Sequence, residues 1–110
     1  MRHKFSVCLT DLNRFNVERR STFELESSGI FSLFLPENSH VPLNRPETLK
    51  RFEDIKRLSY FYDPYISLAA LSSLTDTIKL GTSVCLLTQR NPLLVARGVW
   101  SLQKVSGNRF

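Results

Sequence analysis

The chain has 110 residues, a formal net charge of +5 and an apolar fraction of 42%. A chain of this length forms one domain, and the apolar fraction excludes an intrinsically disordered protein. No stretch approaches the roughly 18 consecutive apolar residues of a membrane helix, and the N-terminus lacks the apolar segment of a secretory signal. We therefore expect a cytoplasmic globular protein that has no membrane partner.

The charged residues and the cysteines bear on whether the protein binds nucleic acid or a metal, or is held together by disulfides. The basic residues are scattered, with only short pairs such as Arg19–Arg20, Lys50–Arg51 and Lys56–Arg57. This pattern favours a solvated basic surface over nucleic-acid binding, although a salt-dependent interaction with DNA would reverse that preference. Cys8 and Cys85 stand far apart and form neither a metal-ligand spacing nor a disulfide framework. We expect both to be buried, reduced thiols, and we expect no metal site.

The first predicted unit is a strand followed by a helix. In His3 to Leu9, polar and apolar residues alternate and then give way to an apolar run, which is typical of a strand. After a polar turn, Asn16 is a suitable N-cap for a helix that runs to about Ser28. Gly29 suits the left-handed position that ends such a helix. The apolar residues of this helix form no clean stripe, so its packing is the least regular of the predicted elements.

The second unit begins with a strand at Ile30 to Leu35, which is followed by the polar residues of Pro36 to His40. A long connection then extends from Val41 to Tyr62, in which Thr48 to Leu58 favours a short helix. Connections between barrel elements usually contain about 2 to 6 residues. An insertion of about 20 residues therefore predicts a lid or a binding loop.

The remaining elements repeat one pattern. Asp63–Pro64 and Asn91–Pro92 each place a capping side chain before a proline, which predicts a helix start. Between these helices, Ile78 to Leu87 is almost entirely apolar or small, as is typical of a parallel strand that is covered on both faces. Two helices that begin alike after two apolar strands indicate successive βα units and an α/β fold. Ligands bind at the carboxyl ends of the strands in such folds, so we expect the chemistry near Thr82 to Arg90.

Three blocks of sequence resemble a known family in the same order. They are GIFSLFLPENSHVPL (Gly29 to Leu43), YDPYISLAALSSLTDTIKLGT (Tyr62 to Thr82) and LGTSVCLLTQRNPLLVARGVWSLQKVSGNRF (Leu80 to Phe110). The chain is thereby similar to the luciferase-like monooxygenase family. These proteins are TIM-barrel oxidoreductases that use flavin mononucleotide (FMN) or the deazaflavin coenzyme of the F-420 type. The resemblance covers nearly the whole chain and is weak before Gly29.

The resemblance implies a partial TIM barrel of about three consecutive βα units with a parallel sheet, because a complete barrel needs about 250 residues. The family's fourth strand begins near Arg109–Phe110. We therefore expect residues 1–110 to form a single partial luciferase-like barrel domain that is truncated before the fourth strand. Helices on one face would leave the other face of the sheet apolar and its edges unpaired. The remainder of the barrel or a homo-oligomer partner is expected to cover it.

Two residues after the second strand are the candidate catalytic residues. The family often carries Pro-Glu-His-x-His at this position, and several deazaflavin-dependent members use the first histidine for proton transfer or substrate contact. Here Asn38 replaces that histidine and His40 retains the second. A carboxamide is not a general acid or base near neutral pH, so the resemblance leaves proton transfer to His40 and ligand contact to Asn38. The alternative for His40 is an exposed or structural side chain. Glu37 either orients a neighbouring polar group or is a solvated carboxylate that caps a turn.

The third block carries the candidate cofactor-binding residues. Ser83–Val84 matches the family position of a non-prolyl cis peptide behind the cofactor ring. The preceding small residues, Gly81 and Thr82, would allow the backbone to approach a planar ligand. The resemblance therefore implies a ring site at Gly81, Thr82, Ser83 and Val84, whereas the residues alone favour a barrel strand with small side chains for packing. Arg90 either meets a phosphate or an anionic substrate or is exposed to solvent.

Two functions from different classes remain open. The first is the N-terminal segment of a flavin- or deazaflavin-dependent oxidoreductase, either a monooxygenase or a hydride-transferring dehydrogenase. Such an enzyme would act on a small-molecule substrate, and the 110-residue chain alone would be inactive. The second is a truncated, diverged, non-catalytic copy that acts as a subunit or an interaction module. Asn38 and the irregular first helix favour the second.

Overall fold

The structure is a computed structural model that describes residues 3–10, 15–40 and 61–110. The short helix expected at Thr48 to Leu58 lies outside the described residues, as does most of the connection from Val41 to Tyr62. No helix of the described part is long and apolar enough to cross a membrane.

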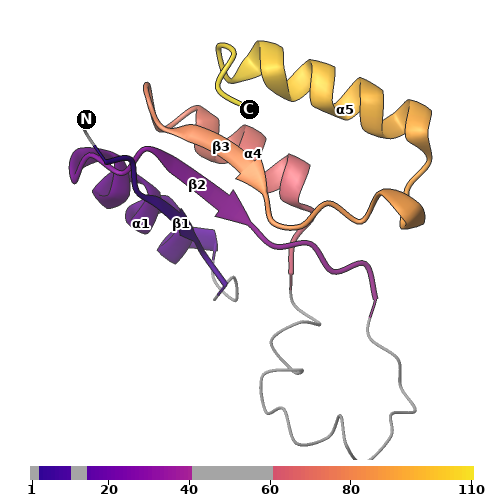
Figure 1. The fold of residues 1–110 in the computed structure, drawn as a ribbon, viewed down its shortest axis with the longest axis horizontal. Coiled ribbons are helices and arrows are strands. Elements are labelled where there is room, and N and C mark those ends of the chain that lie inside the picture. The colour runs from indigo at the N-terminus through magenta and orange to yellow at the C-terminus, as the bar shows by residue number, and fades with distance from the viewer. Residues whose placement is uncertain (1–2, 11–14, 41–60) are drawn as a thin grey trace, which may run out of the picture.

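Three parallel strands form one sheet in the order β1-β2-β3 (Figure 1). The strands are β1 (Ser6–Cys8), β2 (Ser32–Leu35) and β3 (Lys79–Thr82). The helices are α1 (Phe15–Ser27), α4 (Pro64–Ser72) and α5 (Pro92–Val105), with a 3₁₀ turn, η1, at Leu87–Gln89. Each strand is followed by a helix. The predicted α/β class, with three consecutive βα units of a TIM-barrel type and a parallel sheet, is therefore confirmed.

The helix ends follow from local side-chain chemistry. The Asp63 side chain accepts hydrogen bonds from the first amides of α4, and the Asn91 side chain does the same for α5. A proline follows each cap, where its missing N–H costs nothing. At the end of α1, Gly29 has a φ of 77°, the left-handed conformation that glycine adopts without strain. The caps predicted at Asp63 and Asn91 and the terminator predicted at Gly29 are confirmed, whereas the cap predicted at Asn16 was wrong, because α1 already includes that residue.

The core lies between one face of the sheet and the helices. Leu33 and Leu35 of β2 are fully buried and cluster with Leu68 and Leu71 of α4. Alternate residues of a strand point to opposite faces, so Leu33 and Leu35 lie on the same face of β2, which is the face that the helices cover. Figure 1 shows α1 and α4 on that side of the sheet. Burying a leucine side chain contributes roughly 2 kcal/mol, so this small cluster is the main apolar contribution to stability. Ile78, Leu80 and Leu102 complete it.

The opposite face of the sheet differs from expectation. Ser6 and Ser32 are register partners on β1 and β2, and their hydroxyls are hydrogen-bonded at 2.6 Å. Lys79 pairs with Ser32 on the other side. Phe34 and Gly81 are also register partners on this face, which combines polar and small residues with one aromatic ring and is not the uniformly apolar face that was expected. The expected burial of both cysteines was also wrong, because Cys8 is exposed on the edge strand β1, while Cys85 is half-buried.

Arg109 anchors the chain after α5 to the core. Its guanidinium is buried and donates to the carbonyls of Ser72 (2.7 Å) and Ile78 (3.3 Å) and to the hydroxyl of Thr75 (2.8 Å). Its own carbonyl accepts from the amide of Leu80 at 2.8 Å. The chain end therefore lies along the free edge of β3, and a charged residue fastens the end of α5 to the loop that follows α4.

Glu26 makes the equivalent connection for α1. Its carboxylate accepts from the amides of Asp76, Thr77 and Ile78 at 2.6 to 3.2 Å, and from the Thr77 hydroxyl at 2.9 Å. Burial would raise the pKa of Glu26, but these hydrogen bonds outweigh it and the pKa is lowered from 4.5. A single side chain near the end of α1 thus orders the turn that leads into β3.

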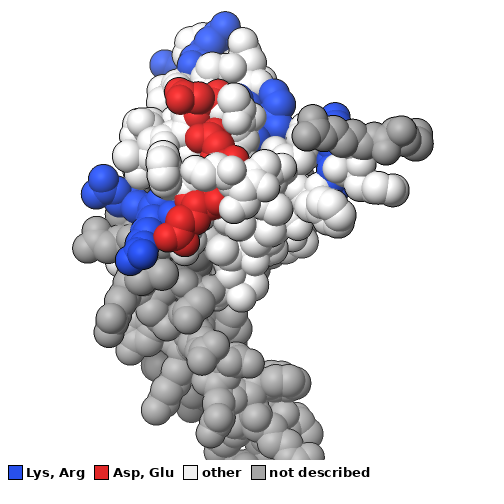
Figure 2. All heavy atoms as spheres, turned by 90° about the vertical axis from the view of Figure 1, so that its left-hand side faces the viewer, with Lys and Arg blue, Asp and Glu red and all other residues white. Residues whose placement is uncertain are grey.

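Charged side chains are mixed on the face that contains the N-terminus and α1. Figure 2 shows basic and acidic residues interspersed among uncharged ones there, without a continuous basic area in the described part of that face. Mixed charge of this kind produces no single-sign field of the sort that attracts a polyanion.

Candidate functional site at the carboxyl ends of β2 and β3

The carboxyl edge of the sheet is formed where β2 and β3 end. The amide of Ser83 donates to the carbonyl of Leu35 at 2.8 Å, and β3 ends at Thr82, one residue before it. The Ser83–Val84 peptide bond is cis, which is the geometry that the family resemblance implied. The predicted strand of Ile78 to Leu87 was therefore too long, because the chain leaves the sheet at Ser83 and curls into η1.

Glu37 provides the contact that the sheet no longer supplies. Its carboxylate accepts from the amide of Leu86 at 2.8 Å and from the Arg90 side chain. The side chain of Glu37 is only 2% exposed, so it is not the solvated cap that was one of its two predicted roles. A carboxylate from the segment after β2 thus orders the segment after β3.

Arg90 binds two carboxylates that lie at opposite ends of the connection between β2 and α4. It binds Glu37 on one side, and its Nη2 donates to Asp63 Oδ2 at 2.8 Å. Burial would lower the pKa of Arg90, but the two carboxylates raise it, so the guanidinium stays charged. Burial would likewise raise the pKa of Asp63, whereas Arg90 and the helix amides lower it. The predicted roles of Arg90, a free anion receptor or a solvated side chain, were both wrong, because its charge is already paired.

Tyr65 extends this network along the N-terminus of α4. The guanidinium carbon of Arg90 lies 4.9 Å from the centre of the Tyr65 ring, which is a cation–π distance. The Tyr65 hydroxyl lies 3.2 Å from Cys85 Sγ. Burial, followed by the hydrogen bond to Cys85, raises the pKa of Tyr65 to about 12. The phenol therefore stays neutral and acts as a hydrogen-bonding group rather than as a base.

The four predicted cofactor-binding residues follow one another along the end of β3. Thr82 is half-buried opposite Leu35, Ser83 is exposed, and the Val84 side chain is 61% exposed. Gly81 has a packing reason for being glycine. A Cβ at this position would lie 2.6 Å from the ring of its register partner Phe34, so Phe34 fills the space that the missing side chain leaves.

The two predicted catalytic residues follow β2 in a separate part of this edge. Asn38 lines a cleft of about 360 Å³ together with Asp63, Gln89 and Arg90, and the described lining includes neither His40 nor Gly81 to Val84. His40 is exposed, and its Nδ1 lies 2.7 Å from Ser39 Oγ. The Ser39 hydroxyl also donates to Gln89 Oε1. The segment that carries His40 is therefore tied to η1.

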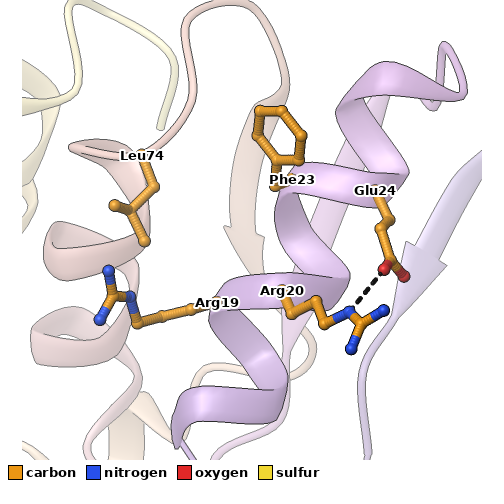
Figure 3. Close-up of a pocket in the computed structure, with 5 residues that line it drawn as sticks. All are labelled: Arg19, Arg20, Phe23, Glu24 and Leu74. Carbon is orange, nitrogen blue, oxygen red and sulfur yellow. Dashed lines mark hydrogen bonds and ion pairs between the residues drawn. The ribbon is translucent and has the colours of Figure 1, made fainter.

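A larger hollow of about 560 Å³ lies elsewhere, between α1 and the end of α4. Figure 3 shows it lined by four residues of α1 and by Leu74, with Arg20 bonded to Glu24 and turned away from Leu74. None of the described lining residues comes from the carboxyl edge. This groove belongs to the helix layer, so volume alone does not locate the chemistry of this fold.

Three residues of the network were not predicted as site members. Asp63 was expected only as a helix cap, while Tyr65 and Gln89 had no assigned contact. No sequence pattern shows that a capping residue also forms an ion pair with a distant side chain, as Asp63 does with Arg90. The one available signal was position, because Gln89 lies within the Thr82 to Arg90 region where the chemistry was expected, while Asp63 and Tyr65 lie at the start of α4.

Comparison with known proteins agrees with this architecture. The model of the family "Luciferase-like monooxygenase" matches residues 6–110. The chain therefore belongs to the luciferase-like monooxygenase family.

The chain is also similar to curated relatives and to a solved structure. It is 32% identical over 88 residues to the uncharacterized proteins Rv0953c of Mycobacterium tuberculosis and Mb0978c of Mycobacterium bovis, an alignment that covers 76% of this chain. It also superimposes on the crystal structure of monooxygenase RslO1 from Streptomyces bottropensis, with a TM-score of 0.71, 19% identity and 97% of this chain covered. The matches span 31% of the length of each of these proteins. At this identity, the likeness to RslO1 shows the fold.

Proposed function

We propose that the chain forms the N-terminal segment of a luciferase-like oxidoreductase that uses FMN or a deazaflavin of the F-420 type. The observation that supports this most strongly is the exposed turn at Ser83–Val84, directly beside the carboxyl ends of two parallel strands. Ligands of α/β folds bind at this edge. Family membership makes a flavin-type ligand the leading candidate for it.

The residues present fit the ring of such a cofactor better than its phosphate. Val84 offers exposed apolar surface, and the hydroxyls of Thr82 and Ser83 stand next to it in the chain, a combination suited to a flat heterocycle with a polar edge. Arg90 is already engaged by Glu37 and Asp63 and therefore does not supply a phosphate site. When bound, the flavin or deazaflavin supplies the redox chemistry, while the protein supplies orientation and electrostatics.

His40 is the proposed proton-transfer residue and Asn38 the proposed ligand contact. An imidazole titrates near neutral pH, whereas a carboxamide only donates and accepts hydrogen bonds. Asn38 lines the cleft beside Gln89 and Arg90, where a polar substrate would meet it. Ser39, which also lines this cleft, is hydrogen-bonded to the neighbouring His40.

The test compares two variants in the full-length enzyme that this proposal requires. His40→Ala is expected to lower turnover about 100-fold or more, the usual scale for a general acid–base group. Asn38→Ala is expected to weaken ligand binding by about 1 kcal/mol with a smaller effect on turnover. His3→Ala is the control, because His3 precedes β1 at the other end of the sheet. Unchanged turnover in His40→Ala would make its role structural and would remove it from the site.

The second candidate function is a non-catalytic subunit or interaction module. The observation in its favour is that Glu37 and Asp63 already pair with the Arg90 charge, while Asn38 replaces an imidazole. Under this candidate, neither FMN nor the deazaflavin would bind, and the His40→Ala variant would behave like the parent in every assay.

A further inference from the structure

Ser39 is the middle residue of a hydrogen-bonded chain that runs from Gln89 to His40. Its hydroxyl donates to Gln89 Oε1, and its oxygen lies 2.7 Å from His40 Nδ1. Ser39 and His40 follow β2, whereas Gln89 belongs to η1 after β3. These hydrogen bonds therefore join the two connections at the carboxyl edge, independently of the ion pair between Glu37 and Arg90.

The arrangement determines which nitrogen of His40 carries its proton. A serine hydroxyl has one proton, and here Gln89 accepts it. The Ser39 oxygen then has only lone pairs left for His40, so Nδ1 must be the donor. A neutral imidazole has one N–H, which leaves Nε2 as the unprotonated nitrogen.

We propose that Ser39 and Gln89 are positioning residues that hold neutral His40 in its Nδ1–H tautomer and so keep Nε2 as the basic nitrogen of the edge. This inference rests on the proposed function, because it assigns a purpose to the tautomer only if His40 transfers protons. Protonation at Nε2 leaves the bond from Nδ1 to Ser39 intact, since both nitrogens of the cation are donors. His40 can therefore gain and lose a proton at Nε2 without breaking the chain to Gln89.

The tautomer is measured by nitrogen-15 NMR of the imidazole at a pH above its titration. The chain has two histidines, so a His3→Gln background leaves His40 as the single signal. We expect a pyrrole-type Nδ1 and a pyridine-type Nε2. In Gln89→Leu the Ser39 proton is free to bond to Nδ1, so the signals should shift toward the Nε2–H tautomer. Ser39→Ala should shift them in the same direction.

Thr88→Ala is the matched control, because Thr88 is exposed on the same 3₁₀ turn and should leave the signals unchanged. The amide fingerprint spectrum of each variant verifies its fold. A predominant Nε2–H tautomer in the parent would overturn the proposal, as would identical signals in the parent and in Gln89→Leu. The two proposals fail separately. If His40→Ala left turnover unchanged while the predicted tautomer was present, the proposed proton-transfer role of His40 would fail and the positioning would stand.

Discussion

The Glu37 carboxylate and the Arg90 guanidinium form an ion pair that joins the segments following two neighbouring strands. Glu37 is almost completely buried and also receives the Leu86 amide, at the point where the chain has left the sheet. Arg90 continues to Asp63, the cap of α4. The Arg90 side chain thus links the connection after β3 to both ends of the connection between β2 and α4, at the edge where the ligand is proposed to bind.

The first prediction concerns the two members of this pair. Arg90→Leu leaves the Glu37 carboxylate buried without its cation, and we expect the free energy of unfolding to fall by about 3 kcal/mol. Glu37→Gln keeps an acceptor for Leu86 and should cost less. The double variant should be less destabilised than the sum of the two, because the second change removes the unpaired charge. Urea unfolding of the four proteins measures the coupling, and strictly additive effects would show that the pair is not an energetic unit.

The second prediction concerns Arg109. Its donors satisfy three carbonyls and a hydroxyl in a buried position, and the Ser72 carbonyl belongs to the negative end of α4. Lysine has a single charged group in place of the planar fork, so Arg109→Lys should leave buried acceptors without partners. We expect a loss of about 3 kcal/mol in the free energy of unfolding. Lys104→Ala, an exposed change on α5, should change it by less than about 0.5 kcal/mol. Equal stability of the two variants would contradict the anchoring role.

The contrast between these two arginines shows what the sequence can predict. The caps at Asp63 and Asn91 and the glycine at Gly29 were predictable, because each acts on its own few residues. Arg90 and Arg109 act on partners 27 to 53 residues away, and no local pattern records such pairing. Only the fold brings those partners together.

The length of β3 was missed, whereas packing was one of the two roles predicted for Gly81. Apolar periodicity continues past Thr82, so it predicted a strand as far as Leu87. The chain leaves the sheet because Glu37, from the other connection, takes the Leu86 amide. The strand ends that border the proposed site are visible in the sequence, whereas the contacts that link the segments after them are not.

The third prediction concerns pH. The folded-state pKa of Glu26 lies below its unfolded-state value, so its hydrogen bonds contribute fully above a pH of about 4.3. That contribution is lost as the pH falls through the folded-state pKa. Glu26→Gln should therefore unfold more easily at pH 7, by about 2 kcal/mol, and should lose less further stability on acidification than the parent does. Glu24→Gln on the same helix is the control, and identical pH profiles for the parent and Glu26→Gln would exclude this role.

The fourth prediction concerns self-association. Helix α5 exposes large apolar side chains, including Leu93 at 78% and Trp100 at 61%, and β1 leaves one edge of the described sheet open. Exposed apolar surface and open edges favour association. We propose that the chain forms homo-oligomers, and we expect sedimentation velocity to show mass increasing with concentration. Leu93→Lys should shift this equilibrium toward the monomer, and a sharp monomer at every concentration would contradict the prediction.

The most direct test of the account is a ligand titration of the nitrogen-15-labelled chain, with FMN and with the deazaflavin coenzyme in separate experiments. Amide shifts report contacts residue by residue and remain measurable when binding is weak. We predict that one of the two ligands moves the amide signals of Thr82, Ser83 and Val84, with smaller changes at Asn38. No response to either ligand, or changes confined to the groove at Arg19 and Phe23, would contradict a flavin-type site at the carboxyl edge of the sheet.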